Sequence, residues 1–475
     1  MRINFAFGKT GLVLDLPEGF CYQVLEARSA VPLSDPAAAI ERALDNPQAG
    51  PPLRQLACGK RSAAISVCDI TRPAPNREVL PPLLARLESG GIPRQRVTIL
   101  IATGLHRPAT EAEVREICGE WVTGNYRVVN HHARKLGEHR FLGNTASGTP
   151  VFVDERFLSA DLHITLGFIE PHLMLGFSGG RKLIAPGLAA EETIKVLHSP
   201  KFMRDPRAVE GSIEENPLHR ELLEIARMAR HDFLVDAALA RGTVAWTPSP
   251  PPACGPPSAE ATGGGPKPFG GRRPEGFGPQ CAFGVRSSYR PIAALFAGEP
   301  EAAHRQGTEL VSQVMLETLD EPVDAVITTA AGYPLDLTFY QAVKGITAAS
   351  HVVKPGGKIL LLAECAEGPG GVEFTQMLAQ HSSHRDFMDK IAAAPVVVDQ
   401  WQIEKLALVA AKAELLYYIP GLPREYHTPL WGLAYATPEA AIGALASSLS
   451  PSARIALIPE GPYVLAQVRQ AHSGQ

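Results

Sequence analysis

The sequence lacks the patterns that mark several common classes of protein. Its seven cysteines are scattered, odd in number and never spaced as Cys-x-x-Cys, which predicts neither a zinc site nor a disulfide framework. It has no block of basic residues, and 45 Lys and Arg stand against 49 Asp and Glu, giving a net charge of -4. We therefore expect no nucleic-acid partner, because proteins that bind nucleic acids neutralise the backbone phosphates with clustered cations.

Long hydrophobic runs are also missing. No stretch reaches the length of a membrane span, and the first twenty residues do not show the charged, apolar and small-residue pattern of a secretory signal. We expect no membrane partner and a cytoplasmic location. With 475 residues the chain is too long for one ordinary core, so two domains are the starting assumption.

Short apolar runs with β propensity alternate with helical patterns along most of the chain. In the first part, strands are predicted at residues 61–70, 95–104, 161–169 and 232–240, with helices at 109–119 and 218–229. The alternation resumes near Asp324, with strands at 323–330 and 357–365 around a helix at 337–353, and a helix at 440–449 precedes strand-like residues 453–468. Such alternation predicts two α/β units with mostly parallel sheets.

A stretch rich in proline and glycine separates the two units. The 32 residues from Pro248 to Pro279 include ten prolines and eight glycines. This composition cannot form a packed element and predicts a flexible linker or surface insertion, which we place at residues 248–288 and expect to be disordered.

The densest group of reactive side chains lies between residues 167 and 198. The turn Ser178-Gly179-Gly180 lets consecutive backbone N–H groups converge without Cβ clashes, as in phosphate-binding loops. Lys182 follows the turn, where its ammonium could neutralise a phosphate or its amine could attack an electrophilic cofactor. A Gly-Gly turn or a lone lysine is more often only structural or solvated, so it is the clustering that indicates a functional site.

Two histidines flank this turn. His172 precedes it and His198 follows it. A neutral imidazole can serve as a proton shuttle or as a ligand for a borderline transition metal, and the sequence leaves both roles open.

Polar residues also follow two predicted strands. Asp69 and Arg72 come directly after one strand, and His106 follows the next. Parallel strands present their carboxyl ends at one edge of a sheet, so these side chains are expected at a common crevice. Arg72 could bind a carboxylate with Asp69 orienting it or accepting a ribose hydroxyl, or the two could form a local surface ion pair.

The second unit contributes fewer candidates. Gln341 and Lys344 are three residues apart on one predicted helix face, which suits a shared oxyanion but is also typical of a solvated face. Trp401 is more often a core residue than a ligand wall, because a large aromatic side chain buries much apolar area.

Taken together and in this order, these motifs resemble the nickel-pincer lactate racemase family. The resemblance covers nearly the whole chain apart from the insertion and is carried by Asp-x-Thr-Arg-Pro from Asp69, Gly-Leu-His-Arg-Pro from Gly104, Pro-His-x-x-x-Gly-x-Ser-Gly-Gly-Arg-Lys from Pro171, His198, Gly-Tyr-Pro-Leu-Asp from Gly332, Tyr-Gln-x-x-Lys from Tyr340 and Asp-Gln-Trp from Asp399. It implies two α/β domains with an active site in the interdomain cleft. We assign residues 1–310 to an N-terminal cofactor-binding domain, 311–435 to a C-terminal domain and 436–475 to a segment that returns to the N-terminal domain.

The resemblance also implies a role for each candidate. The cofactor would be nickel held in a pyridinium-3,5-bisthiocarboxylic acid mononucleotide, the nickel-pincer nucleotide, made by separate biosynthesis proteins and covalently attached to Lys182. His198 matches the nickel ligand, and His106 and His172 match the acid–base pair. Substrate-binding positions would be Arg72, Gln341, Lys344 and Trp401. Further cofactor-binding positions would be Asp69, Ser178, Gly179 and Gly180.

The implied activity is inversion of the α-carbon of a 2-hydroxy acid such as lactate by proton-coupled hydride transfer. Loss of the α-hydrogen as hydride, while a base takes the hydroxyl proton, gives a 2-keto acid instead of a dianion. Two histidines are needed, one for each orientation of the hydroxyl group. The sequence leaves the particular 2-hydroxy acid open.

Two other functional hypotheses require different sets of site residues. A non-catalytic carrier of the cofactor would keep Lys182 and His198 but would not need both His106 and His172. An NAD-type dehydrogenase is disfavoured, because no Gly-x-Gly-x-x-Gly follows a predicted strand with an acidic residue at the right distance.

Overall fold

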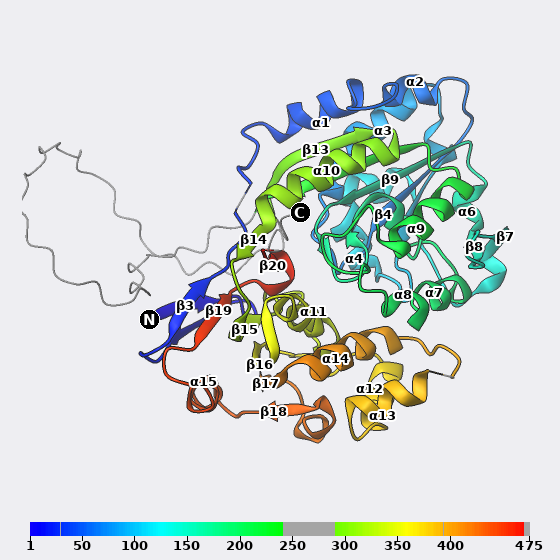
Figure 1. Ribbon diagram of the computed structural model, residues 1–475. Helices are drawn as coiled ribbons and strands as arrows, with labels where there is room; N and C mark the ends of the chain where they lie inside the picture. Colours follow the sequence, from blue (N-terminus) through cyan, green and yellow to red (C-terminus); the bar gives the residue numbers. More distant parts are fainter. Residues whose placement is uncertain (29, 241–289, 393, 470–475) are drawn as a thin grey trace, which may run out of the picture.

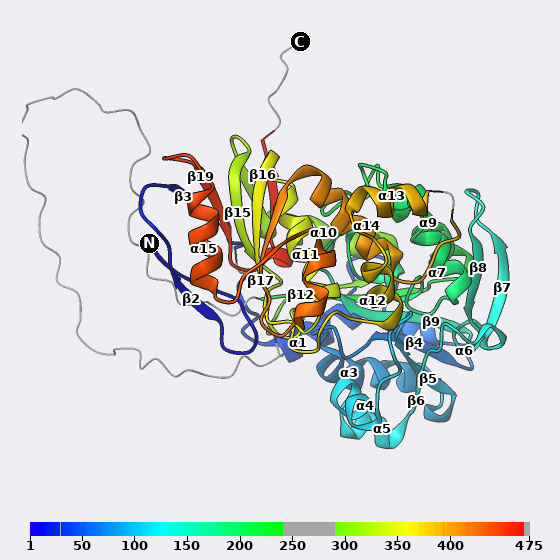
Figure 2. The same cartoon turned by 90° about the horizontal axis from the view of Figure 1, so that it is seen from below.

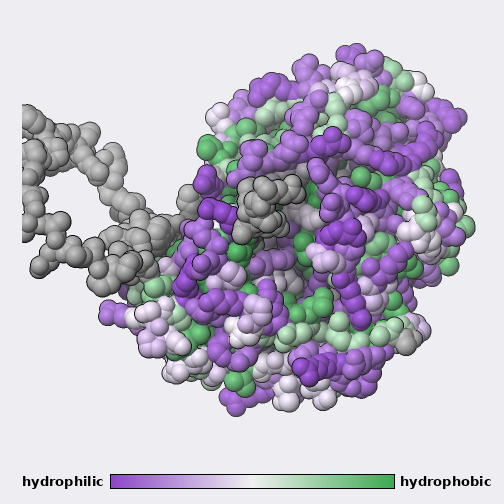
Figure 3. Space-filling model, in the orientation of Figure 1, coloured by the Kyte–Doolittle hydropathy of each residue, from purple (hydrophilic) through white to green (hydrophobic). Residues whose placement is uncertain are grey.

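Two six-stranded sheets form the cores of two lobes in the computed structural model (Figure 1). The structure describes residues 1–28, 30–240, 290–392 and 394–469, so the predicted insertion at 248–288 lies outside the described residues. Polar side chains cover most of the face shown in Figure 3, with apolar ones scattered between them. In the described ranges, every helix is too short or too polar to cross a membrane.

The first sheet confirms the strands predicted in the first part of the chain. Its strand order is β13 (Ile292–Gly298), β12 (Phe233–Leu239), β9 (Leu162–Phe168), β4 (Ala63–Cys68), β5 (Val97–Ala102) and β6 (Arg127–Asn130). All neighbouring pairs are parallel except β12 and β13, which are antiparallel. The mostly parallel α/β fold is therefore as predicted.

Helices cover both faces of this sheet. Alternate residues of β4 belong to different apolar clusters, with Ile65 and Val67 in one and Ala64 in the other, because successive strand side chains point to opposite faces. The first face carries α1 (Pro36–Asp45), α2 (Leu53–Ala57), α3 (Asn76–Ser89), α4 (Glu111–Cys118) and α5 (Glu120–Asn125). The second carries α6 (Glu155–Leu158), α7 (Glu191–Leu197), α8 (Pro200–Met203) and α9 (Pro217–Met228).

Further short elements complete the first lobe. Helix α10 (Pro300–Met315) packs over β12 and β13. Two antiparallel hairpins join β7 (His139–Asn144) to β8 (Pro150–Asp154) and β10 (Pro171–His172) to β11 (Gly176–Phe177). The second hairpin leads into a 3-10 turn, η3 (Gly180–Leu183).

The second sheet is parallel throughout. Its strand order is β18 (Gly432–Ala434), β17 (Glu414–Tyr418), β16 (Val353–Leu362), β15 (Val323–Thr329), β19 (Arg454–Ile458) and β3 (Cys21–Val24). One face carries α11 (Phe339–Ser350), α12 (Val372–Ala379), α13 (His384–Ile391) and α14 (Gln400–Lys412). The other carries α15 (Pro438–Ser447) and the hairpin of β1 (Arg2–Phe5) and β2 (Leu12–Asp15), and Figure 2 shows α15 and α14 on opposite sides.

Both ends of the described chain lie in the second lobe, which differs from the predicted domain limits. Strand β19, from the segment expected to return to the N-terminal domain, pairs instead with β15 and with β3 near the N-terminus. Strand β20 (Leu465–Val468) pairs with β14 (Leu316–Leu319), and the expected boundary at residue 310 falls inside α10. The period of apolar residues predicts that a strand exists, but parallel partners far apart in sequence leave no local signal.

Helix α11 approaches the second sheet very closely at Gly345. A Cβ atom there would lie 2.2 Å from the Thr329 carbonyl oxygen of β15. The same helix carries Gln341 and Lys344. Because Gly345 has no side chain, α11 can lie close to the sheet, and this distance fixes the positions of Gln341 and Lys344.

We expect Gly345→Ala to destabilise the protein by about 1–3 kcal/mol, the usual cost of overpacking a core, because the helix must move away from β15. Urea unfolding followed by circular dichroism measures this difference. Gly443→Ala is the matched control, since Gly443 lies inside α15 and its added Cβ would have no atom from elsewhere in the described structure within 4 Å. There alanine should stabilise by up to about 1 kcal/mol. Equal stability of Gly345→Ala and the wild type would contradict the packing argument.

Candidate active site

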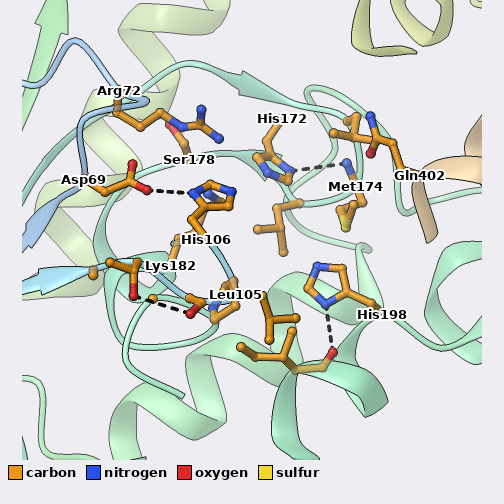
Figure 4. Close-up of a pocket in the computed structure, with 18 of the residues that line it drawn as sticks. Asp69, Arg72, Leu105, His106, His172, Met174, Ser178, Lys182, His198 and Gln402 are labelled. Carbon is orange, nitrogen blue, oxygen red and sulfur yellow. Dashed lines mark hydrogen bonds and ion pairs between the residues drawn. The ribbon is translucent and has the colours of Figure 1, made fainter. Parts of the chain in front are cut away.

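A cavity of about 510 Å³ lies between the two lobes. The first lobe contributes the segments after β4 and β5, the region from β10 to η3, and α7 and α9, whereas the second contributes α11 and the start of α14. The predicted site residues that line it are Asp69, Arg72, His106, His172, Ser178, Gly179, Lys182, His198, Gln341, Lys344 and Trp401. The structure thus brings together side chains that are more than 300 residues apart, and Figure 4 shows those from the first lobe.

His106 and Asp69 form a closely bonded pair at the cavity. The His106 Nδ1 lies 2.6 Å from the Asp69 Oδ2 (Figure 4). The other Asp69 oxygen accepts from the Thr71 hydroxyl at 2.6 Å. Burial would raise the pKa of Asp69, but His106 and Arg72 overcome this effect and hold it below its ordinary value. An ionised carboxylate only accepts hydrogen bonds, so Nδ1 donates and Nε2 is left to face a ligand.

His172 is kept neutral by its surroundings. Burial, reinforced by Lys182 and Lys344, holds the pKa of His172 well below its ordinary value. Its Nδ1 accepts the backbone N–H of Met174 at 3.4 Å. The two histidines therefore differ, because His106 is paired with a carboxylate whereas His172 faces cations.

His198 has the hydrogen bonding of a metal-binding imidazole. Its Nδ1–H donates to the Ile194 carbonyl at 2.8 Å, which leaves the Nε2 lone pair free. Burial lowers the pKa of His198 to about 4, so the ring is neutral at physiological pH. Metal-ligating histidines commonly donate their other N–H to a backbone carbonyl or carboxylate, which fixes the tautomer and the ring orientation.

Three cations converge on the cavity from both lobes. Arg72, Lys182 and Lys344 all line it, and Glu170 contacts Arg72 with 3.9 Å between Nε and Oε1. Burial and then the neighbouring Arg72 lower the pKa of Lys182 to about 8, and the same causes hold the pKa of Lys344 well below its ordinary value. Lysines whose pKa values are lowered by burial and by a neighbouring cation indicate a site for an anionic ligand.

Lys182 is also suited to nucleophilic attack. In the described part of the chain, its ammonium has no hydrogen-bond or ion-pair partner. A desolvated lysine beside another cation is a standard form of activated amine, because more of it is unprotonated near neutral pH.

Ser178 is placed at the cavity, but its hydroxyl group is used within the protein. It donates to the Phe168 carbonyl at 3.0 Å and accepts the Glu170 N–H at 3.0 Å. These bonds hold the β10–β11 hairpin against the end of β9. Ser178 therefore shapes the loop that carries Lys182.

Gly180 departs from the predicted cofactor contact. It does not line the cavity, and a Cβ there would lie 2.8 Å from Leu234 on the buried side of the turn. Gly179 does line it, at φ +84°, and a Cβ there would fall 2.4 Å from the carboxylate of the fully buried Asp236. A Gly-Gly pair indicates positive φ angles, but the direction in which each residue faces depends on the strand beneath it.

The second lobe supplies polar groups that the sequence reasoning missed. Tyr340 and Asp399 both line the cavity, and the Tyr340 hydroxyl accepts the Trp401 Nε1–H at 3.1 Å. Burial raises the pKa of Asp399 to about 6. A signal for Tyr340 was available, because it lies one helical turn before Lys344 on the same helix face. The buried Gln341 Oε1 has no hydrogen-bond partner among the described residues, so it can accept from a ligand.

The donor set also constrains how a metal could bind. Within the described ranges, no group of three His, Cys, Asp or Glu side chains could hold a metal ion by itself. A nickel ion bound at His198 would need further ligands from outside these side chains. The His198 Nε2 and the Lys182 ammonium, which have no partner among the described residues, and the surrounding cations fit an anionic, metal-bearing group.

The fold and the cavity define a two-lobed α/β protein with a cavity between its lobes that is lined by histidines and cations. Residues 7–211 match the family model "Lactate racemase N-terminal domain", and residues 319–466 match "Lactate racemase C-terminal domain". The lactate racemase of Thermoanaerobacterium thermosaccharolyticum is 31% identical over 470 residues, covering 98% of this chain and 99% of that protein. The lactate racemase of Lactiplantibacillus plantarum is 31% identical over 434 residues, covering 90% of each. The chain belongs to the lactate racemase family and is an isomerase.

Solved structures agree with this assignment. The lactate racemase apoprotein from Thermoanaerobacterium thermosaccharolyticum superposes with a TM-score of 0.80 at 30% identity, covering 99% of this chain and 100% of that one. A protein from Thermotoga maritima gives a TM-score of 0.61 at 15% identity, covering 93% and 100%, which shows a common fold alone.

Proposed function

We propose that this protein inverts the α-carbon of a 2-hydroxy acid, with lactate as the simplest candidate, and that it uses a nickel-pincer nucleotide. The observation that carries the proposal is the convergence of two differently placed histidines, three cations and a third imidazole, partly buried and held through Nδ1, on one interlobe cavity. Family membership supports the racemase chemistry.

The residues that would hold the cofactor are those with polar groups that have no partner in the described part of the chain. Lys182 would form the covalent attachment, and His198 would bind nickel through its free nitrogen. The nucleotide itself would come from separate biosynthesis proteins. When bound, the group supplies a hydride acceptor for the α-hydrogen of the substrate.

The chain's own side chains would handle the carboxylate and the proton. Arg72 and Lys344 would bind the substrate carboxylate, and the Gln341 amide would hold an oxygen or hydroxyl beside them. Anchoring of this kind keeps a 2-keto acid in the cavity while its carbonyl group turns.

Two bases serve the two orientations of the hydroxyl group. His106 would take the hydroxyl proton of one enantiomer at Nε2, and the Asp69 carboxylate would stabilise the imidazolium that forms. His172, kept neutral by burial and nearby cations, would take the proton of the other. The histidine that faces the inverted hydroxyl must carry the proton that it donates to the product, so one histidine enters each turnover as imidazolium and the two exchange protonation states.

We expect Asp69→Asn to lower the racemisation rate constant by about 10²-fold, since the amide cannot stabilise a His106 imidazolium as a carboxylate does. Initial rates from each enantiomer measure the effect. Asp161→Asn is the control, because Asp161 binds Arg61 at the surface. An Asp69→Asn variant with the wild-type rate would exclude the paired role of Asp69.

The experiment that tests the proposed function is a chiral assay of the cofactor-loaded protein with a panel of single enantiomers. Small aliphatic, longer aliphatic, aromatic, dicarboxylic and polyhydroxylated 2-hydroxy acids are compared. At least one acid should approach a racemic or epimeric mixture from both directions without added NAD. Tight cofactor binding with no interconversion of any acid would favour a non-catalytic carrier.

A further inference from the structure

The imidazole of His198 is held from both lobes. In the first lobe, its Nδ1–H donates to the Ile194 carbonyl at 2.8 Å. From the second lobe, the Trp401 indole lies against the ring, with 4.3 Å between centroids and 40° between planes. Trp401 is only 4% exposed and, with Val398, packs into an apolar cluster made otherwise of first-lobe residues. The start of α14 is therefore part of the wall around His198.

Tyr340 holds the indole in this place. An indole N–H is only a donor, and the Tyr340 hydroxyl accepts the Trp401 Nε1–H at 3.1 Å. The next residue, Gln402, donates from Nε2 to the Tyr340 backbone carbonyl at 2.7 Å. These two bonds tie the start of α14 to the start of α11, and the first fixes the rotation of the indole.

The backbone just before Trp401 is also constrained. Asp399 precedes α14 at φ +67°, the left-handed region that non-glycine residues rarely adopt. Such a conformation persists only where the surrounding structure fixes it, and it is commonly found at ligand sites. The path of the chain thus directs Trp401 toward His198 at a conformational cost.

We propose that Tyr340 is a positioning residue, whose hydroxyl fixes the Trp401 indole on the His198 ring and thereby sets the direction of the free imidazole nitrogen. The inference rests on the proposed role of His198 as a nickel ligand. Its physical basis is that outer partners of a metal-binding histidine fix its ring orientation, and their loss costs about 10–100-fold in metal affinity or activity. Here the outer partner comes from the opposite lobe, so docking of the second lobe completes the nickel site.

The first measurement uses cofactor-free protein. The chain has four tryptophans, so ¹⁵N-tryptophan labelling gives a small set of indole N–H signals, and Trp401→Phe identifies the one from Trp401. We expect Tyr340→Phe to speed hydrogen exchange of this N–H by about 10-fold or more. Tyr417→Phe is the control, since it removes a hydroxyl that donates to the Leu430 carbonyl at 3.0 Å and does not line the cavity. Unchanged exchange in Tyr340→Phe would overturn the proposal.

The second measurement uses cofactor-loaded protein and follows nickel loss to a chelator. Tyr340→Phe should lose nickel on the order of 10-fold faster than the wild type, and Trp401→Phe at least as fast. The double variant should lose nickel no faster than Trp401→Phe, because both changes remove one interaction. If Tyr340 instead only contacts substrate, Tyr340→Phe raises KM both in the wild type and in the Trp401→Phe variant and leaves the rate of nickel loss unchanged. That result would overturn the proposal.

The two failures are distinguishable. A wild-type protein that binds no nickel contradicts the proposed function. Stable nickel in the wild type with unaltered loss in Tyr340→Phe contradicts only the positioning role.

Discussion

Replacing either His106 or His172 with alanine should reduce interconversion of the substrate enantiomers by about 10²–10⁴-fold, the usual contribution of a positioned acid or base. Inversion needs a proton-handling group for each orientation of the hydroxyl, so neither histidine can substitute for the other. Nickel content should persist, because His198 is unchanged in both variants. Chiral chromatography and metal analysis of the same samples provide the two readouts.

His132→Ala is the matched control for these variants. His132 also forms a histidine–carboxylate pair, with 2.9 Å between its Nδ1 and the Glu138 Oε2, but it does not line the cavity. Its replacement should leave turnover unchanged. Wild-type turnover in both cavity variants would remove the acid–base assignment and favour a carrier.

Replacing Lys182 with alanine should abolish covalent attachment of the cofactor. In wild-type protein produced together with the biosynthesis proteins, intact-mass analysis should show an adduct that peptide mapping locates to Lys182. Attachment requires the unprotonated amine, and burial lowers the pKa of Lys182 to about 8. The rate of adduct formation should therefore rise with pH up to about 8 and level off above it.

Lys195→Ala controls for the loss of a lysine near the site. Lys195 lies on α7, where it pairs with Glu191 at 2.6 Å and does not line the cavity. This variant should carry the same adduct as the wild type. Active wild-type enzyme with an unmodified Lys182 would disprove the covalent link while leaving the cations' role in binding intact.

The layers of the fold could be predicted from the sequence, because the spacing of apolar residues in strands and helices is a local property. Residues 61–70 and 95–104 contain β4 and β5, and the motif around Gln341 and Lys344 lies on α11 as predicted. The pairing of β3 with β19 was not predictable, since neither segment contains a signal for a partner at the other end of the chain.

The same distinction applies to the site. Side chains that follow parallel strands or share a helix face could be placed at one crevice from spacing alone, and the structure brings Arg72, His106 and Lys344 to one cavity. The inward direction of Gly180 depends on tertiary packing against Leu234, so spacing could not give it. The contact of Trp401 with His198 likewise arises only when the two lobes meet.

The most direct test of the central claim uses a 2-deuterated, enantiopure form of an acid that the chiral assay identifies as a substrate. If the α-hydrogen leaves as hydride and returns to the same substrate molecule, the inverted product should retain its deuterium in ordinary water. If instead a side chain removes it as a proton that exchanges with solvent, the product should contain hydrogen at the α-carbon. Retention is the result we predict, and loss of the deuterium would contradict the account.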